Sequence, residues 1–235
     1  MQLHAAHDYL LSQFLSPYQN RRKDRWGGSI ANRFRMMAAI IQGARQRVGD
    51  YSIWVKISAH DGHRNGMRVE EAIEIARMLQ DVGCDAIEMS CGSGPGFDSI
   101  RVAKIPVEEA FKLVPWYKNM SPLKKRLSAL VAPLVFKKHR PPYNYNVAAA
   151  SRIKEHVDVP VIAVGGTRRM KDMEEVVREN KADYVALFRP LIIEPNIVAR
   201  FRDGKRDESR CMDCGYCLLG VTANRLKCYY GRVPD

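Results

Sequence analysis

The sequence predicts an α/β fold, namely the C-terminal part of a (β/α)8 TIM barrel that lacks the first strands. Short apolar runs of strand type alternate with stretches of helical periodicity, and parallel strands need such long crossovers to return to one sheet. Five such runs are found, whereas a complete barrel has eight strands and usually takes about 250 residues. With 235 residues, of which 46% are hydrophobic, the chain can bury one sizeable core.

The strand-type runs are short, apolar and bounded by turn residues. We expect strands at residues 1–4, 52–58, 85–90, 159–164 and 183–187. We expect helices at residues 30–48, 69–82, 147–156 and 169–180. Ser29 is a suitable N-cap for the first helix, and Gly49 and Gly83 stand just beyond the ends of the first two.

The predicted barrel is incomplete, which has consequences for its interior and its edges. We expect a partial barrel to expose two sheet edges and an apolar interior, so that the chain alone is marginally stable and can form a homo-oligomer. The side chains expected to fill the interior, and to lose partners when the barrel is open, are Ile53, Val55, Ile57, Ile87 and Val161.

The chain is expected to have two domains, a partial barrel over residues 1–203 and a cysteine-rich tail over residues 204–235. An irregular basic insertion at about residues 92–142 interrupts the barrel. Residues 110–154 contain ten Lys or Arg and no Asp or Glu, which nearly equals the net charge of +12. Because the charge is concentrated there and no nucleic-acid-binding fold is evident, we expect no nucleic-acid partner. The segment fits a lid for an anionic ligand, a membrane-surface element or a solvated excursion.

Neither a membrane span nor a secretory signal is visible in the sequence. No run approaches the roughly 18 to 20 apolar residues of a membrane-spanning helix, so we expect none, and a cytoplasmic location. In that compartment the six cysteines would be thiols or metal ligands. Cys84 and Cys91 flank a strand and are expected to be small core residues.

The first candidate for chemistry is His4-Ala-Ala-His7-Asp8-Tyr9, which follows the first strand. Two imidazoles three residues apart, and a phenol two residues later, can reach the same small volume. N–H donors that meet at a carbonyl oxygen withdraw electron density, and a phenol can deliver a proton. A pair of metal ligands or two ordinary surface histidines would fit this spacing as well.

The residues that follow make the motif specific. They read Leu10-Leu-Ser-Gln-Phe-Leu-Ser-Pro17 and Asn20-Arg-Arg-Lys-Asp-Arg-Trp-Gly-Gly-Ser-Ile-Ala-Asn-Arg33. Together with the histidines they resemble the signature of the old yellow enzyme family of NADH:flavin oxidoreductases, H-x-A-H-x-Y-L-L-x-Q-F-L and N-x-R-x-D-x-Y-G-G-S-x-x-N-R. Trp26 replaces the usual Tyr, and Asp8 stands where Gly is common.

The resemblance implies roles for the residues of both motifs. His4 and His7 would bind the carbonyl of a small-molecule substrate or another anionic acceptor, and Tyr9 would donate a proton to the α-carbon. The run from Asn20 to Arg33 is expected to be structural, since its arginines can brace the loop and its glycines permit a tight turn.

Lys56 stands in the middle of an apolar strand, where an unpaired ammonium group would be costly. The resemblance implies that it faces N1 and the C2 oxygen of the flavin and stabilises the anionic reduced form. An ion pair with Glu88 on the next strand is the alternative.

Gly165, Gly166, Phe188 and Arg189 follow the last two strands, where barrels commonly bind phosphate. The resemblance assigns them to the phosphate of FMN, although Gly is frequent where Phe188 stands. The alternative is that the two glycines only close a tight turn.

The tail contains Cys211, Cys214, Cys217 and Cys228, at spacings that can surround one ion or cluster. This pattern resembles the [4Fe–4S] motif of the family branch with trimethylamine dehydrogenase and dienoyl-CoA reductase. Structural zinc uses similar cysteine pairs, so zinc remains the alternative.

The sequence therefore predicts an FMN-dependent oxidoreductase of the ene-reductase type. By resemblance, NAD(P)H would supply hydride through the flavin to an activated acceptor, expected to be an α,β-unsaturated carbonyl compound. The alternative is a truncated, non-catalytic interaction module that carries a metal.

Overall fold

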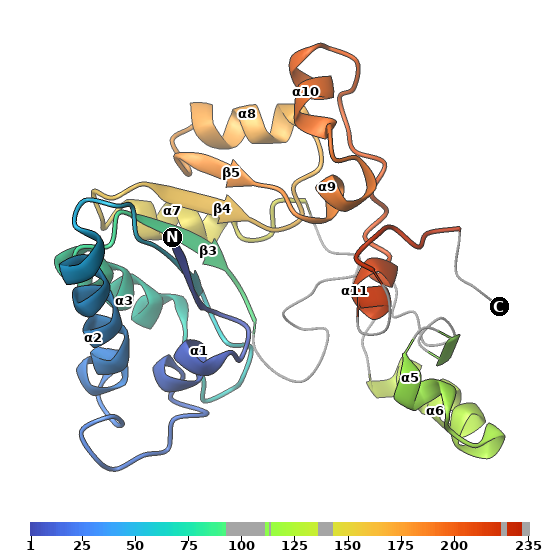
Figure 1. Ribbon diagram of the computed structural model, residues 1–235, viewed down its shortest axis with the longest axis horizontal. Coiled ribbons are helices and arrows are strands. Elements are labelled where there is room, and N and C mark those ends of the chain that lie inside the picture. The colour runs from blue at the N-terminus through green and yellow to red at the C-terminus, as the bar shows by residue number, and fades with distance from the viewer. Residues whose placement is uncertain (93–110, 113, 136–142, 222–224, 232–235) are drawn as a thin grey trace. The chain divides into compact units, whose positions relative to one another are not determined.

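Figure 1 shows the chain in a computed structural model, which describes residues 1–92, 111–112, 114–135, 143–221 and 225–231. The described residues belong to two compact units. The first unit comprises residues 1–92, 143–167 and 171–186, and the second comprises the other described residues. Much of the predicted basic insertion, residues 93–110, 113 and 136–142, lies outside the described residues. None of the described helices is long and apolar enough to cross a membrane.

The first unit is built on a parallel sheet of five strands, in the order β1-β2-β3-β4-β5. All five predicted strands are confirmed, each within a few residues of its expected ends. They are β1 (Gln2–Ala5), β2 (Trp54–Ser58), β3 (Ala86–Ser90), β4 (Val161–Val164) and β5 (Tyr184–Ala186). Strands that follow one another in space in their sequence order are what a segment of a (β/α)8 barrel requires.

Four helices connect these strands, as the sequence predicts. They are α2 (Ile30–Val48), α3 (Val69–Asp81), α7 (Val147–Lys154) and α8 (Met170–Arg178). The N-cap of α2 is confirmed, because Ser29 Oγ accepts a hydrogen bond from the backbone N–H of Asn32. Gly49 ends this helix with φ of 55°, a left-handed conformation that glycine adopts without strain. An additional short helix, α1 (Leu10–Leu15), follows the histidine motif.

The two faces of the sheet differ in chemistry, and here one prediction is wrong. Val55, Ile57, Ile87 and Val161 are fully buried and belong to one cluster with apolar residues of the helices. Ile53 is also fully buried. These side chains therefore do not lose partners in an open barrel interior, because they form the core between sheet and helices. Successive residues of a strand point to opposite faces, so the interior face has the other set of side chains.

The second unit contains helices that were not predicted from the sequence. They are α5 (Pro115–Lys118), α6 (Pro122–Val135), α9 (Arg189–Ile193), α10 (Ile197–Arg202) and α11 (Tyr216–Val221). The insertion is therefore not irregular throughout, since α6 lies within it. A buried carboxylate, Glu194, organises part of this unit: it accepts hydrogen bonds from Ser209 Oγ at 3.1 Å and from the backbone N–H of Arg210 at 2.8 Å.

The structural role predicted for the run up to Arg33 agrees with the contacts of this arginine. Its guanidinium is almost fully buried and donates to the backbone oxygens of Leu15 and Gly28. It also forms an ion pair with Glu71 on α3, at 2.5 Å. Arg33 thus joins the loop after α1 to two helices, which fixes the segment that follows the histidine motif.

Candidate active site

The interior face of the sheet has a row of register partners from all five strands. The row begins with His4, Lys56 and Glu88 and continues through Ile162 to Tyr184. Register partners on parallel strands point to the same face. Three titratable side chains therefore lie next to one another on β1, β2 and β3.

Within this row, Lys56 forms the ion pair that the sequence analysis gives as its alternative. Its Nζ lies 2.9 Å from Glu88 Oε1, and both side chains are largely buried. Gln2 on β1 donates a hydrogen bond from Nε2 to the other oxygen of Glu88. The ammonium group thus has a carboxylate partner on this face, which meets the requirement for a partner of a buried cation.

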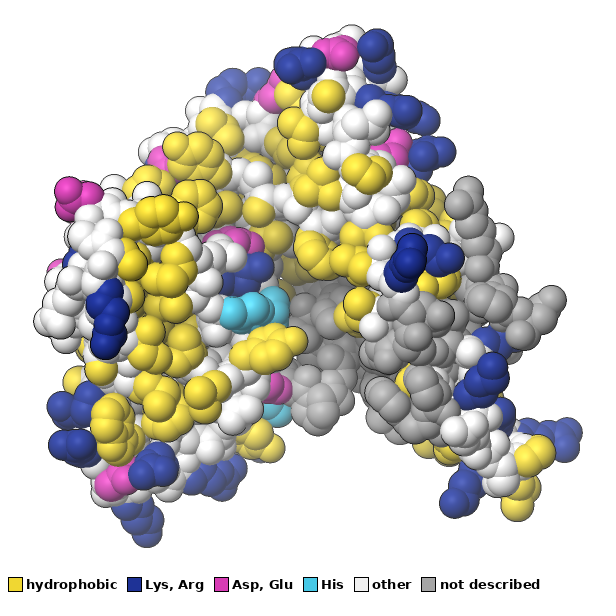
Figure 2. Space-filling view, viewed as in Figure 1, with side chains coloured by type: hydrophobic (Ala, Val, Ile, Leu, Met, Phe, Trp, Pro, Cys, Tyr) yellow, Lys and Arg dark blue, Asp and Glu magenta, His cyan; other side chains and the backbone are white. Residues whose placement is uncertain are grey.

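The structure brings His4, His7 and Tyr9 together. The ring of His4 lies with its centroid 5.3 Å from that of His7 and 4.7 Å from that of Tyr9, both in edge-on orientations. Tyr9 is 61% exposed, so its phenol is accessible to a small molecule. Figure 2 shows histidine side chains reaching the surface on one face of the protein.

The turn after β1, within the histidine motif, has an uncommon backbone conformation. His7 and Asp8 have φ values of 56° and 63°, in the left-handed region that favours glycine. His and Asp are among the few other residues enriched there. Asp8 is held by Gln13, which donates to its backbone oxygen at 2.6 Å, and by Gln19, which donates to its carboxylate. The departure from the Gly of the family pattern therefore falls at a position where the backbone favours Gly.

The surroundings of the two histidines favour their neutral form. Burial, together with the nearby His4 and Lys56, lowers the pKa of His7 to about 4. Burial and Lys56 also lower the pKa of His4. Each imidazole is therefore neutral near pH 7 and can donate one hydrogen bond and accept another. Such a pair can polarise an oxygen without adding charge.

The four residues assigned to the FMN phosphate lie in different units. Gly165 and Gly166 follow β4 in the first unit with φ values of 131° and 76°, and a side chain at Gly165 would collide with the ring of Tyr145. Both positions thus require glycine for the turn, which agrees with the alternative interpretation and leaves the phosphate role untested. Phe188 and Arg189 lie in the second unit, where Phe188 is the N-cap residue of α9 and is exposed.

Arg189 is tied to the cysteine motif of the same unit. Its Nη1 lies 3.1 Å from Oδ1 of Asp213, a residue between Cys211 and Cys214. The other oxygen of Asp213 forms an ion pair with Arg168, and both arginines and the carboxylate are buried or nearly so. Asp213 therefore holds two guanidinium groups beside the cysteines.

The four tail cysteines line one small cavity in the second unit, together with Arg189, Met212 and Tyr230. Among the described residues, no three His, Cys, Asp or Glu side chains are placed ready to hold a metal ion. The donor set nevertheless fits a thiophilic metal or cluster, since four thiols surround one space. Burial raises the pKa of the Cys211 thiol to about 11 and also raises the pKa of Cys214 and Cys217. A bound metal cation would offset this cost by stabilising the thiolates.

A packing contact brings the last cysteine to the other three. Gly220 lies against the ring of the buried Tyr229, and a Cβ at position 220 would overlap that ring. Tyr229 Oη also donates to the backbone oxygen of Arg225 at 2.9 Å. The contact holds the segment of Cys228 against α11, the helix that contains Cys217.

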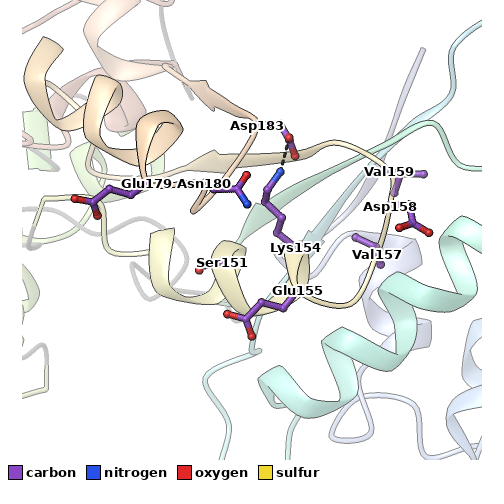
Figure 3. Close-up of a pocket in the computed structure, with 9 residues that line it drawn as sticks. All are labelled: Ser151, Lys154, Glu155, Val157, Asp158, Val159, Glu179, Asn180 and Asp183. Atoms are coloured by element: carbon purple, nitrogen blue, oxygen red, sulfur yellow. Dashed lines mark hydrogen bonds and ion pairs between the residues drawn. The ribbon is translucent and has the colours of Figure 1, made fainter.

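A second cavity, of about 330 Å³, lies in the first unit at the amino ends of β4 and β5. This is the end of the sheet opposite to the histidine motif. Figure 3 shows Lys154 and Asp183 pointing toward one another there. Asp183 also accepts a hydrogen bond from the backbone N–H of Val161 at 2.9 Å. Asp85, before β3 and thus two strands earlier, makes the equivalent contacts with the N–H of Ile53 and with Arg45. These contacts join neighbouring strands, which indicates a structural role for this end.

The sequence analysis did not identify Ser90 and Asp213, although both contact candidate site residues. His7 Nε2 lies 2.6 Å from Ser90 Oγ. β2 and β3 both end in Ser, at positions 58 and 90, and this repeated serine at the strand ends is visible in the sequence. Asp213, an acidic residue between two cysteines, is a similar signal. Cys84 and Cys91, in contrast, are confirmed as buried core residues.

Comparison with known proteins adds the family context. The profile of the NADH:flavin oxidoreductase / NADH oxidase family matches residues 1–102 and 107–208. An NADH oxidase of Thermoanaerobacter brockii is 32% identical over 233 residues, which is 97% of this chain and 30% of the relative. An NADPH dehydrogenase of Geobacillus sp. (strain WCH70) is 30% identical over 83% of this chain and 45% of the relative. The chain thus spans less than half of the length of each of these two relatives.

Solved structures share the fold at lower identity. A 2-naphthoyl-CoA reductase complex aligns with a TM-score of 0.71 and 23% identity, over 97% of this chain and 30% of the other. A histamine dehydrogenase from Rhizobium sp. 4-9 aligns with a TM-score of 0.68 and 21% identity, over 97% and 28%. The old yellow enzyme homologue of Zymomonas mobilis aligns with a TM-score of 0.59 and 17% identity, over 100% and 52%. These alignments support the assignment to a partial TIM barrel.

Proposed function

Since the chain belongs to the NADH:flavin oxidoreductase / NADH oxidase family, we propose that it is an FMN-dependent oxidoreductase that takes hydride from NAD(P)H and reduces an activated small-molecule acceptor. The observation that carries this proposal is the grouping of His4, His7 and Tyr9 beside the Lys56 ammonium, at one end of a parallel sheet. Barrel enzymes have their active sites at the carboxyl ends of the strands.

The chemistry of several residues supports FMN as the cofactor. The Lys56 ammonium stands on the interior face, where it can stabilise negative charge on the flavin ring. Gly165 and Gly166 leave backbone without side chains after β4, which suits a phosphate. Arg189 belongs to the second unit, and its role toward the phosphate rests on the family resemblance alone. Bound FMN would supply hydride transfer between the nucleotide and the acceptor.

The histidine motif would act on the acceptor. His4 and His7, both neutral, donate hydrogen bonds to the acceptor oxygen and make a conjugated alkene more electrophilic. Tyr9 donates its proton to the α-carbon, and its exposure leaves the phenol open to an entering molecule. An α,β-unsaturated carbonyl compound has both reacting positions that this arrangement requires.

We further propose that Cys211, Cys214, Cys217 and Cys228 hold a [4Fe–4S] cluster, with zinc as the alternative. Four thiols around one cavity support a metal site of either kind. A cluster would relay single electrons to the flavin, whereas zinc would only stabilise the tail.

The absorption spectrum of the anaerobically purified protein tests this function. A flavin band that bleaches on addition of NADH or NADPH, and returns with an α,β-unsaturated ketone, is the expected result. A colourless protein that contains zinc and takes up no FMN would contradict the enzyme and favour a metal-bearing interaction module. Because the chain spans only part of its relatives, the longest available form of the protein should be measured together with the 235-residue chain.

A further inference from the structure

Ser90 is the last residue of β3, and its hydroxyl contacts the catalytic motif. Its Oγ lies 2.6 Å from Nε2 of His7, and the residue is 7% exposed. The register partner of Ser90 on β2 is Ser58, whose hydroxyl donates to the backbone oxygen of Gly92 at 3.1 Å. Two serines at equivalent strand ends therefore have different partners, and only Ser90 reaches a histidine of the motif.

The partners available to Ser90 determine the direction of this hydrogen bond. In the part of the chain that the structure describes, His7 Nε2 is the one hydrogen-bond partner of Ser90 Oγ. A buried hydroxyl proton without an acceptor is costly, and a neutral imidazole has one acceptor nitrogen and one N–H. The arrangement that satisfies both groups is Oγ–H donating to Nε2. The proton of neutral His7 is then on Nδ1.

His4 has the opposite arrangement. The backbone N–H of Ala6 donates to Nδ1 of His4 at 3.3 Å, which makes this nitrogen the acceptor. The proton of neutral His4 is then on Nε2. Each of the two adjacent rings thus retains one N–H donor that a backbone or serine group does not use.

We propose that Ser90 is a positioning residue, which fixes His7 as the Nδ1–H tautomer so that His4 and His7 together present two N–H donors to the oxygen of a carbonyl acceptor. The role of these donors toward an acceptor rests on the proposed function. The tautomer itself depends only on contacts within the first unit. Without Ser90, His7 could place its proton on either nitrogen, and the second donor would be lost for part of the molecules.

Long-range ¹H–¹⁵N NMR of protein labelled at histidine reads the tautomer directly. We expect His7 in the unmodified protein to show a protonated Nδ1 and an unprotonated Nε2 at neutral pH. Ser90→Ala should shift both nitrogens toward an averaged or reversed pattern, whereas Ser90→Thr, which keeps the hydroxyl, should restore it. Ser58→Ala is the matched control, because it removes a hydroxyl at the register-equivalent position, and it should leave the His7 signals unchanged.

The outcomes separate this inference from the proposed function. A protonated Nε2 on His7 in the unmodified protein, or His7 signals that Ser90→Ala does not move, would overturn the role of Ser90. If Ser90→Ala does not fold, Ser90→Cys makes the same comparison with a weaker donor. If the protein takes up no flavin, the proposed function fails while the NMR result still decides the tautomer. In flavin-loaded protein, Ser90→Ala should raise KM for a carbonyl acceptor and leave reduction by the nucleotide unchanged.

Discussion

Lys56 on β2 and Glu88 on β3 are register partners and form an ion pair of 2.9 Å on the interior face of the sheet. Each charge thereby offsets the free-energy cost of burying the other. A cation that would serve a flavin is thus held in place by a carboxylate of the protein itself, which is how preorganised electrostatic groups act.

Replacing Lys56 by Met is expected to destabilise the protein by about 1 to 3 kcal/mol, because it leaves the Glu88 carboxylate on a largely buried face. The double variant Lys56→Met/Glu88→Gln should recover most of that loss in urea unfolding. If Lys56 also serves the flavin, the double variant should still bind FMN more weakly. Equal FMN affinity in the double variant and the unmodified protein would show that Lys56 serves only the ion pair with Glu88 and not the flavin.

Tyr9→Phe should slow the reoxidation of reduced protein by an α,β-unsaturated ketone by about 10²- to 10⁴-fold, the usual value of general acid catalysis. Its reduction by NADH or NADPH should change little, because the proton is needed only in the second half-reaction. Stopped-flow measurement of the two half-reactions checks this. Tyr51→Phe, at a tyrosine of similar exposure outside the motif, is the control. Equal slowing of both half-reactions by Tyr9→Phe would remove Tyr9 from the proton-donor role.

Lowering the pH should decrease the free energy of unfolding, because His7 is buried in its neutral form. Burial lowers its pKa from 6.5 to about 4, so between these values the unfolded chain binds a proton that the folded chain does not. This stability is fully present above pH 6.5 and is lost as the pH falls toward 4, on the order of 1 to 3 kcal/mol with allowance for partial exposure. Urea unfolding across this range should show a smaller pH dependence for His7→Gln than for His156→Gln, which changes an exposed histidine. An identical pH dependence in the two variants would contradict the burial of His7.

Anaerobically purified protein should contain about four iron and four sulfide per chain, as expected for one [4Fe–4S] cluster. Replacing any one of the four cavity-lining cysteines by Ser should lower the iron content. Cys84→Ser is the control, since Cys84 is buried in the core of the first unit, and it should leave the iron content unchanged. Stoichiometric zinc without iron would instead establish the zinc alternative.

Asp213→Asn should destabilise the second unit by about 2 to 4 kcal/mol, because two nearly buried guanidinium groups lose the carboxylate that they share. Differential scanning calorimetry should show the loss. The matched control is Asp203→Asn in the same unit, whose partners Arg202 and Lys205 are exposed, and it should cost only about 0 to 1 kcal/mol. A similar loss in both variants would mean that burial does not strengthen the Asp213 contacts.

The strands and long helices were predictable because each has a local signal. The helix of residues 30–48 has a capping serine, a uniform period and a glycine end, and its bounds are those predicted. The histidine motif was predictable for the same reason, since its members are close in sequence and the structure keeps them together.

Which side chains of each strand face the barrel interior was not predictable from such short apolar runs. In β2, both Val55 and Ile57 were expected inside the barrel, yet they face the helices. A period of two fixes which residues share a face, but not which face is the interior, and a shift of one residue exchanges the two. Lys56 itself indicated which face is the interior one, because a charged side chain is not expected on the apolar face that packs against the helices. The pairing of Asp213 with Arg168 and Arg189 escaped prediction because these contacts join residues far apart in the sequence.

The contact between Gly220 and Tyr229 leaves no room for a Cβ at position 220. The two positions therefore constrain one another during evolution. A related chain that has a side chain at the position of Gly220 must have lost the aromatic ring at the position of Tyr229, or must hold its last cysteine by other means. The two positions are expected to vary together, although neither of them is a cysteine.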